Sequence, residues 1–134
     1  MILSIFTDGG SKGNPGPAAI GYVMYIQGKE VFKGRQDIGV ATNNDAEYRA
    51  LIEALKHVVK RKKQLGEFEE IQVSSDSRLL VNQVRGLFKI KNAKIREYVL
   101  QVRMLENEIG LPISYKDIPR EENTVADALV NNKL

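Results

Sequence analysis

The chain has 134 residues, of which 43% are hydrophobic and 28% charged, and its net charge is +3 at pH 7. Such a length and composition are typical of one globular domain with a sizeable core, and we expect a single domain over residues 1–134. The absence of cysteine excludes disulfides, thiolate zinc sites and a cysteine nucleophile, and fits a reducing compartment. The opening apolar run is too short for a signal peptide and no segment is long enough to span a membrane, so we expect a cytoplasmic protein. Nothing in the sequence indicates an obligate oligomer or a protein partner, and we expect a monomer.

Three strands are predicted in the first part of the chain. The apolar run 2–7 stops at Asp8, and the glycine- and proline-rich segment 8–17 predicts a turn. The β-branched and aromatic residues of 19–27 predict a second strand, which a short hairpin signal joins to a third strand over 31–40. We expect these three strands to form an antiparallel meander.

The rest of the chain alternates between helices and strands. Capping side chains at 42–45 precede apolar residues spaced three and four apart, which predicts an amphipathic helix over 44–64. The elements predicted after it are a strand over 70–75, a helix over 77–84, a helix around 95–105, a strand over 112–118 and a helix over 123–131. This order predicts an α/β fold with a five-stranded mixed sheet, in which the last two strands are parallel and helices cover both faces.

Four acids lie where ligands collect in such a sheet, at points where strands end and helices begin. Asp8 ends the first strand and Asp76 ends the fourth. Glu47 lies in the first turn of the long helix, at the edge of its buried face, and Asp127 is bracketed by small apolar residues in the last helix. Singly, each acid has an ordinary role as a turn former, helix cap, helix-dipole partner or exposed acid. Together, they cannot all stay ionised in one pocket without counter-charge, which a divalent cation such as Mg²⁺ supplies.

Basic residues are concentrated in two segments. Residues 60–63 read Lys-Arg-Lys-Lys, and residues 85–96 carry five further Lys or Arg side chains with no acid among them. Each segment is either an electrostatic footprint for a polyanion or a solvated helix end. The single histidine, His57, follows Lys56 on the long helix and is expected to face solvent.

Four motifs together resemble those of the type 1 ribonuclease H family, in particular its small single-domain microbial members. The motifs are Thr7-Asp8-Gly9-Gly10-Ser11 with Gly13-Asn14-Pro15-Gly16-Pro17, Thr42-Asn43-Asn44-Asp45-Ala46-Glu47-Tyr48, Ser75-Asp76-Ser77, and Ile118-Pro119-Arg120-Glu121-Glu122-Asn123 with Ala126-Asp127. Each motif is weak alone, but all four in this order on the expected elements are highly specific. The resemblance covers essentially the whole chain.

The resemblance implies an endoribonuclease that hydrolyses the RNA strand of RNA/DNA hybrids and leaves 5′-phosphate and 3′-hydroxyl ends. It implies a catalytic metal site that holds two Mg²⁺ ions, with Mn²⁺ as a possible substitute, and whose ligands are Asp8, Glu47, Asp76 and Asp127. In this arrangement Asp8 bridges the two ions. Glu47 and Asp76 complete the first ion's site, and Asp127 completes the second.

The same resemblance implies residues that contact the hybrid. Asn14, Asn43 and Asn44 match family positions at the minor groove, where an amide can both donate to and accept from base edges and 2′-hydroxyls. Thr42 matches a position near a phosphate of the DNA strand, and Asn92 aligns loosely with the same region. The alternative is local: Asn14 forms a turn, and Asn43 or Asn44 caps the long helix.

The chain departs from the family pattern in one loop. Many members carry a histidine there, whereas this chain has Arg120, seven residues before Asp127. Arginine stays protonated near neutral pH, so it cannot act as a base. It can instead hold the scissile phosphate or ease product departure and so join the catalytic set, or it can be an exposed partner of Glu121 or Glu122.

Two other functions are compatible with the same fold. One is a catalytically weak or inactive nucleic-acid-binding module, and the other is a nuclease for double-stranded RNA or structured DNA. The four acids favour an enzyme, because a pure binder has no reason to gather negative charge beside a phosphate backbone. The asparagines favour a substrate with 2′-hydroxyls.

Overall fold

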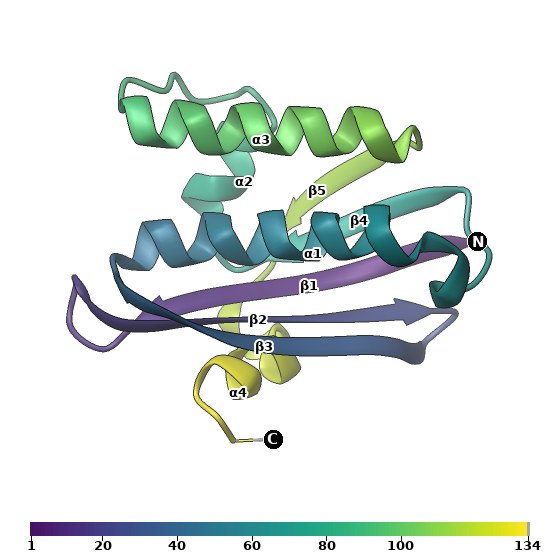
Figure 1. Ribbon diagram of the computed structural model, residues 1–134, viewed down its shortest axis with the longest axis horizontal. Coiled ribbons are helices and arrows are strands. Elements are labelled where there is room, and N and C mark those ends of the chain that lie inside the picture. Colours follow the sequence, from purple (N-terminus) through teal and green to yellow (C-terminus); the bar gives the residue numbers. More distant parts are fainter. Residues whose placement is uncertain (134) are drawn as a thin grey trace.

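The computed structural model describes residues 1–133 and shows a five-stranded sheet with helices on both faces (Figure 1). The strands are β1 (Ile2–Ser11), β2 (Gly16–Ile26), β3 (Lys29–Ala41), β4 (Glu70–Ser75) and β5 (Ile113–Asp117), in the sheet order β3-β2-β1-β4-β5. The helices are α1 (Asn43–Leu65), α2 (Arg78–Val84), α3 (Ala93–Ile109) and α4 (Thr124–Val130), and a 3₁₀ turn, η1 (Arg120–Glu122), precedes α4. The predicted α/β fold is confirmed; Leu134, the end of the expected domain, lies outside the described residues. No helix within residues 1–133 has the length and apolar character needed to cross a membrane.

The central strand of the sheet is β1. It is antiparallel to β2 and parallel to β4, and β2 is antiparallel to β3, as predicted for the meander. The last residue pair between β1 and β4 joins Thr7 to Ser75. Asp8 and Asp76 therefore follow the same pair on neighbouring strands, which places both acids at one edge of the parallel part of the sheet.

The prediction that β1 ends at Asp8 is wrong. The strand continues to Ser11, and β2 begins at Gly16 rather than at residue 19, so the turn is limited to residues 12–15. This extension was not predicted because it contains Gly9 and Gly10, and glycine is a poor strand former. Its missing side chain is needed here: a Cβ on Gly9 would lie 2.3 Å from the carbonyl carbon and oxygen of Ala46 in α1.

The main core lies between α1 and the sheet. Thr42 caps α1, since its Oγ1 accepts a hydrogen bond from the Asp45 N–H at 3.0 Å. Leu51 and Leu55 of α1 are fully buried in the same core as Leu3 and Ile5 of β1. Burial of each such side chain stabilises the fold by about 1.5–3 kcal/mol. The helix carrying Glu47 is thereby fixed against the strand carrying Asp8.

The remaining helices lie on both sides of this core (Figure 1). α3 packs on α1, whereas α4 lies on the opposite face of the sheet, against β1 and β2. The predicted β5 and α4 are each shorter than expected, and η1 was not predicted.

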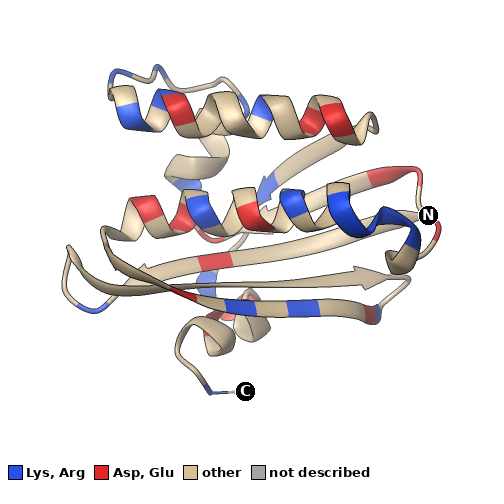
Figure 2. Cartoon of the chain, viewed as in Figure 1, with Lys and Arg blue, Asp and Glu red and all other residues tan. Residues whose placement is uncertain are grey.

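Figure 2 shows the basic run 60–63 at the C-terminal end of α1. About 20 Å of helix separates this run from Glu47 in the first turn.

Candidate metal and nucleic-acid site

Three of the predicted acids meet where the parallel pairing of β1 with β4 ends. Asp8 comes from β1, Glu47 from the first turn of α1, and Asp76 from the residue after β4. Each offers a carboxylate oxygen, and these oxygens all lie within 4.8 Å of one another. Such a group of oxygen ligands is suited to a hard divalent cation.

The backbone of Gly9 joins two of these acids. Its N–H donates to Asp8 Oδ1 at 3.0 Å and to Glu47 Oε1 at 2.8 Å. This shared donor requires the close approach of β1 to α1 that the glycine permits. The first turn of α1 is therefore fastened to the strand at the position of the acids.

Asn123 is a member of the site that the sequence analysis did not identify. Its side chain is 1% exposed, and its Nδ2 donates to the Thr7 carbonyl at 2.9 Å and to Asp76 Oδ2 at 3.1 Å. The backbone carbonyl of Asn123 accepts a hydrogen bond from the Asp127 N–H at 3.1 Å. Asn123 belongs to the motif over 118–123, but nothing in the sequence showed that its amide would reach across to β1 and to the acid that follows β4.

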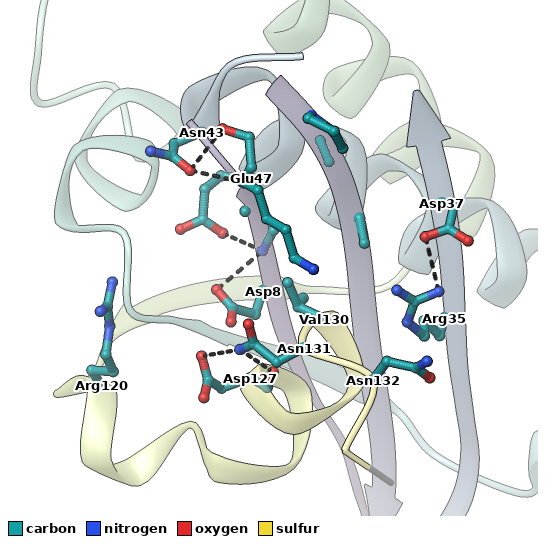
Figure 3. A pocket seen from close by; sticks show the side chains of 17 residues that line it. Asp8, Arg35, Asp37, Asn43, Glu47, Arg120, Asp127, Val130, Asn131 and Asn132 are labelled. Carbon is teal, nitrogen blue, oxygen red and sulfur yellow. Dashed lines mark hydrogen bonds and ion pairs between the residues drawn. The ribbon is translucent and has the colours of Figure 1, made fainter. Parts of the chain in front are cut away.

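Asp127 lies beside this group without belonging to it, as judged over residues 1–133. Figure 3 shows its carboxylate next to Asp8, at the edge of the same groove. Asn131, one turn further along, donates from Nδ2 to the Asp127 carbonyl at 2.9 Å and to Asp127 Oδ1 at 3.3 Å. The fourth acid is thus brought to the site by α4 rather than by the sheet.

The negative charges of these acids are not balanced by positive charge in the site. Burial, followed by the charges of Asp76 and Asp127, raises the pKa of Asp8 to about 7. Burial and the charge of Asp8 raise the pKa of Glu47 well above its usual range. Neither carboxyl would be so hard to ionise with a cation among them. The donor set and its electrostatics therefore fit a metal ion.

Arg120 brings a cationic side chain into this groove. The groove has a volume of about 520 Å³, and Arg120 lines it together with Asp8, Glu47 and Asp127 (Figure 3). The guanidinium charge lowers the pKa of Glu47 and so partly offsets its burial. η1 therefore places Arg120 in the same groove as the acids.

The turn between β1 and β2 is attached to the start of α1. The Asn43 N–H donates to Asn14 Oδ1 at 3.0 Å, and Asn43 Oδ1 accepts from the Ser11 N–H at 2.9 Å. Because Thr42 caps α1, the alternative role of Asn43 or Asn44 as the helix cap is wrong. Asn14 and Asn43 are exposed and Asn44 is half-buried. Asn14 and Asn43 are thus bonded to each other, and Asn43 lines the groove that holds Asp8 and Glu47.

Asn92 is the cap of α3. Its Oδ1 accepts from the N–H groups of Lys94 and Ile95 at 2.9 and 3.1 Å. Lys94 Nζ in turn pairs with Asp45 Oδ2 at 3.2 Å, next to the α1 cap residue Thr42. The Lys94–Asp45 pair thus joins the start of α3 to the start of α1.

His57 is only partly exposed, so the prediction that it faces solvent holds in part. Its ring is half-buried and stacks on Phe32 of β3, with ring centroids 3.7 Å apart. Burial and the nearby charges of Arg61 and Lys60 lower its pKa. His57 is not among the residues that line the acidic groove.

The sheet order and the carboxylate cluster define a ribonuclease H-like fold with a candidate metal site. The model of the RNase H family matches residues 2–111, and the chain belongs to this family. The match ends before Arg120, Asn123 and Asp127. The alignments to individual relatives extend over α4.

The chain is 40% identical to the Bifunctional protein Rv2228c of Mycobacterium tuberculosis, over all of this chain but 36% of that protein. The solved structure of the N-terminal RNase H domain of that protein has a TM-score of 0.87 and matches over 98% of each chain. Ribonuclease HI of Halobacterium salinarum is 38% identical over 96% of this chain and 62% of its own length. LC11-RNase H1, solved in complex with an RNA/DNA hybrid, has a TM-score of 0.89 at 38% identity, over 97% of this chain and 94% of its own. The chain thus spans about a third to under two thirds of the length of these curated relatives.

Proposed function

We propose that the chain is a metal-dependent endoribonuclease that hydrolyses the RNA strand of RNA/DNA hybrids, leaving 5′-phosphate and 3′-hydroxyl ends. The observation that carries the proposal is the convergence of Asp8, Glu47 and Asp76, in a member of the RNase H family. The relative solved with an RNA/DNA hybrid supports the choice of substrate. A pure binding module is disfavoured, because buried carboxylates repel a phosphate backbone unless cations lie between them.

The acids would hold two divalent cations. Oxygen-only donors suit Mg²⁺ or Mn²⁺, and the raised pKa values of Asp8 and Glu47 indicate missing positive charge. Asp8, Glu47 and Asp76 would hold one ion, and Asp8 with Asp127 the other. When bound, the ions supply Lewis-acid stabilisation of charge at the phosphate and make a water molecule nucleophilic at neutral pH.

Arg120 acts on the phosphate rather than on protons. Its guanidinium stays charged and offers several N–H donors, so it binds oxygens of the scissile phosphate beside Glu47. The same contact lets it draw the cleaved 5′-phosphate away from the acids. Its place in the acidic groove supports this role.

Two polar surfaces flank the acids and would hold the two strands. Asn14, Asn43 and Asn44 would read the minor groove, and the bonds that fasten the β1–β2 turn to α1 keep the side chains of Asn14 and Asn43 in place. Thr42 and Asn92 would contact a phosphate of the DNA strand, with the Lys94–Asp45 pair holding α3 beside α1. The asparagine amides distinguish RNA by its 2′-hydroxyls.

A cleavage assay tests the proposal. Wild type, Asp76→Asn and Asp117→Asn are incubated with labelled RNA/DNA hybrid, DNA duplex and RNA duplex in Mg²⁺ or Mn²⁺. Asp76→Asn keeps an oxygen for the Asn123 amide but removes the ligand charge, so cleavage of the hybrid should fall by about a thousandfold or more. Asp117→Asn makes the same change at an exposed position outside the groove and should cut like wild type.

Each alternative has its own result. A wild type that shifts the hybrid on a gel but cuts nothing is a binding module. Equal cleavage of RNA duplex and hybrid identifies the broader nuclease. Equal cleavage by wild type and Asp76→Asn shows that the acids have been misassigned.

A further inference from the structure

One row of residues across three strands lies beneath α4. Asp8 of β1 pairs with Gly21 of β2, and Gly21 pairs with Arg35 of β3. α4 contacts all three strands on this face. The row therefore has an acid of the site at one end and a cation at the other, with a glycine between them.

The glycine forms a socket for the helix. A Cβ on Gly21 would lie 2.8 Å from Leu129 Cβ and 2.9 Å from the Ala126 carbonyl oxygen. α4 therefore rests directly on the backbone of β2, and a larger residue at position 21 would lift it. This contact fixes the height of α4 above the sheet but supplies no polar anchor.

Arg35 supplies that anchor. Its Nε donates to the Leu129 carbonyl at 2.7 Å. Its Nη1 pairs with Asp37 Oδ1 at 3.0 Å (Figure 3). Leu129 lies in the last turn of α4, where its carbonyl also accepts from the Asn132 N–H at 3.1 Å and where a cation is favoured. Within residues 1–133, this is the side-chain hydrogen bond that joins the sheet to the body of α4.

α4 carries an acid of the site but has few polar ties to the sheet. Asp127 lies beside Asp8 at the edge of the groove (Figure 3). Asn123 holds the beginning of α4 through β1 and Asp76. The far end of a helix of only seven residues depends on Arg35.

We propose that Arg35 is a positioning residue for Asp127, holding the last turn of α4 on the sheet so that this carboxylate stays at the metal site. Its effect on cleavage rests on the proposed function, but its effect on α4 does not. Arg35 acts through the Leu129 carbonyl, two strands away from Asp8. It needs no contact with the substrate.

The test compares Arg35→Ala with Lys33→Ala, which removes an exposed cation from the same strand. Hydrogen exchange of the α4 amides should become about tenfold faster in Arg35→Ala. Mn²⁺ affinity, measured by calorimetry, should fall by about tenfold. With saturating hybrid, kcat should fall by a similar factor while KM stays unchanged. Lys33→Ala should match wild type in all three measurements.

Two results would overturn the inference. One is unchanged exchange in α4 of Arg35→Ala. The other is a raised KM with unchanged kcat and Mn²⁺ affinity, which would make Arg35 a contact for the nucleic acid. If the wild type cuts no hybrid, the proposed function fails, yet exchange and Mn²⁺ binding still decide the role of Arg35.

Discussion

The acids of the site are held in two different ways. Asp8, Glu47 and Asp76 belong to the centre of the fold, where β1, α1 and β4 meet over a buried core. Asp127 belongs to α4, a helix of seven residues on the opposite face of the sheet (Figure 1). The first three are placed by strand register and by one close helix–strand contact. The fourth is placed by a glycine socket and a few hydrogen bonds.

Substitutions in the two regions should therefore have different effects. A change at the centre should alter the stability of the whole chain, because the acids share their contacts with the core. A change around α4 should alter the position of one ligand and leave most of the fold intact. Stability and metal binding therefore report on different regions.

The largest effect is expected at Asp8 without metal. Its pKa rises on folding from 3.8 to about 7, so the native state binds more protons than the unfolded state between these values, and stability falls as pH rises through them. The loss reaches about 4 kcal/mol above pH 7. In EDTA, Asp8→Asn should therefore be more stable than wild type by about that amount at pH 8, and similar to it at pH 4.

Urea unfolding at the two pH values, with and without Mn²⁺, measures this effect. Added Mn²⁺ should stabilise wild type at pH 8 but stabilise Asp8→Asn much less, since the variant lacks a charged ligand. Equal stability of the two proteins at pH 8 in EDTA would show that ionisation of Asp8 does not destabilise the folded state.

The next effect is expected at the contact between β1 and α1. Gly9→Ala places a methyl group 2.3 Å from the Ala46 carbonyl atoms, which forces the helix away from the strand. The free energy of unfolding should fall by about 3 kcal/mol. Gly10→Ala is the matched control, because its nearest neighbour would be Val130 Cγ1 at 3.6 Å, an ordinary contact. Equal stability of the two variants would contradict the proposed tight contact.

The central region was largely predictable from sequence. The pattern of 70–75 predicted β4 with its observed bounds, and parallel pairing with β1 then places Asp76 beside Asp8. Strand register places these two acids together, and this register follows from buried apolar residues that occur in regular order. The extension of β1 past Asp8 was not predicted, because Gly9 and Gly10 are poor strand formers. The need for a glycine at position 9 becomes clear only from the close approach of α1.

The α4 region was less predictable. The motifs pointed to Asp127 and Arg120, but Asn123 and Arg35 act through bonds to backbone carbonyls that are distant in the sequence. Hydrophobic periodicity carries no information about such bonds. The stacking of His57 was missed for a related reason, since its partner Phe32 lies on the edge strand β3.

The smallest effect is expected at Asn131, which orients Asp127 from within its own segment. Asn131→Ala removes the bonds to the Asp127 carbonyl and Oδ1, both at an exposed site, so the free energy of unfolding should change by less than about 0.5 kcal/mol. Mn²⁺ affinity should fall by about three- to fivefold, because a freed carboxylate must be ordered again on binding. Calorimetry beside Lys133→Ala, an exposed neighbour, checks this. A loss as large as that of Arg35→Ala would mean that Asp127 is positioned by its own rotamer more than by the seating of α4, and no loss would assign its position to the helix alone.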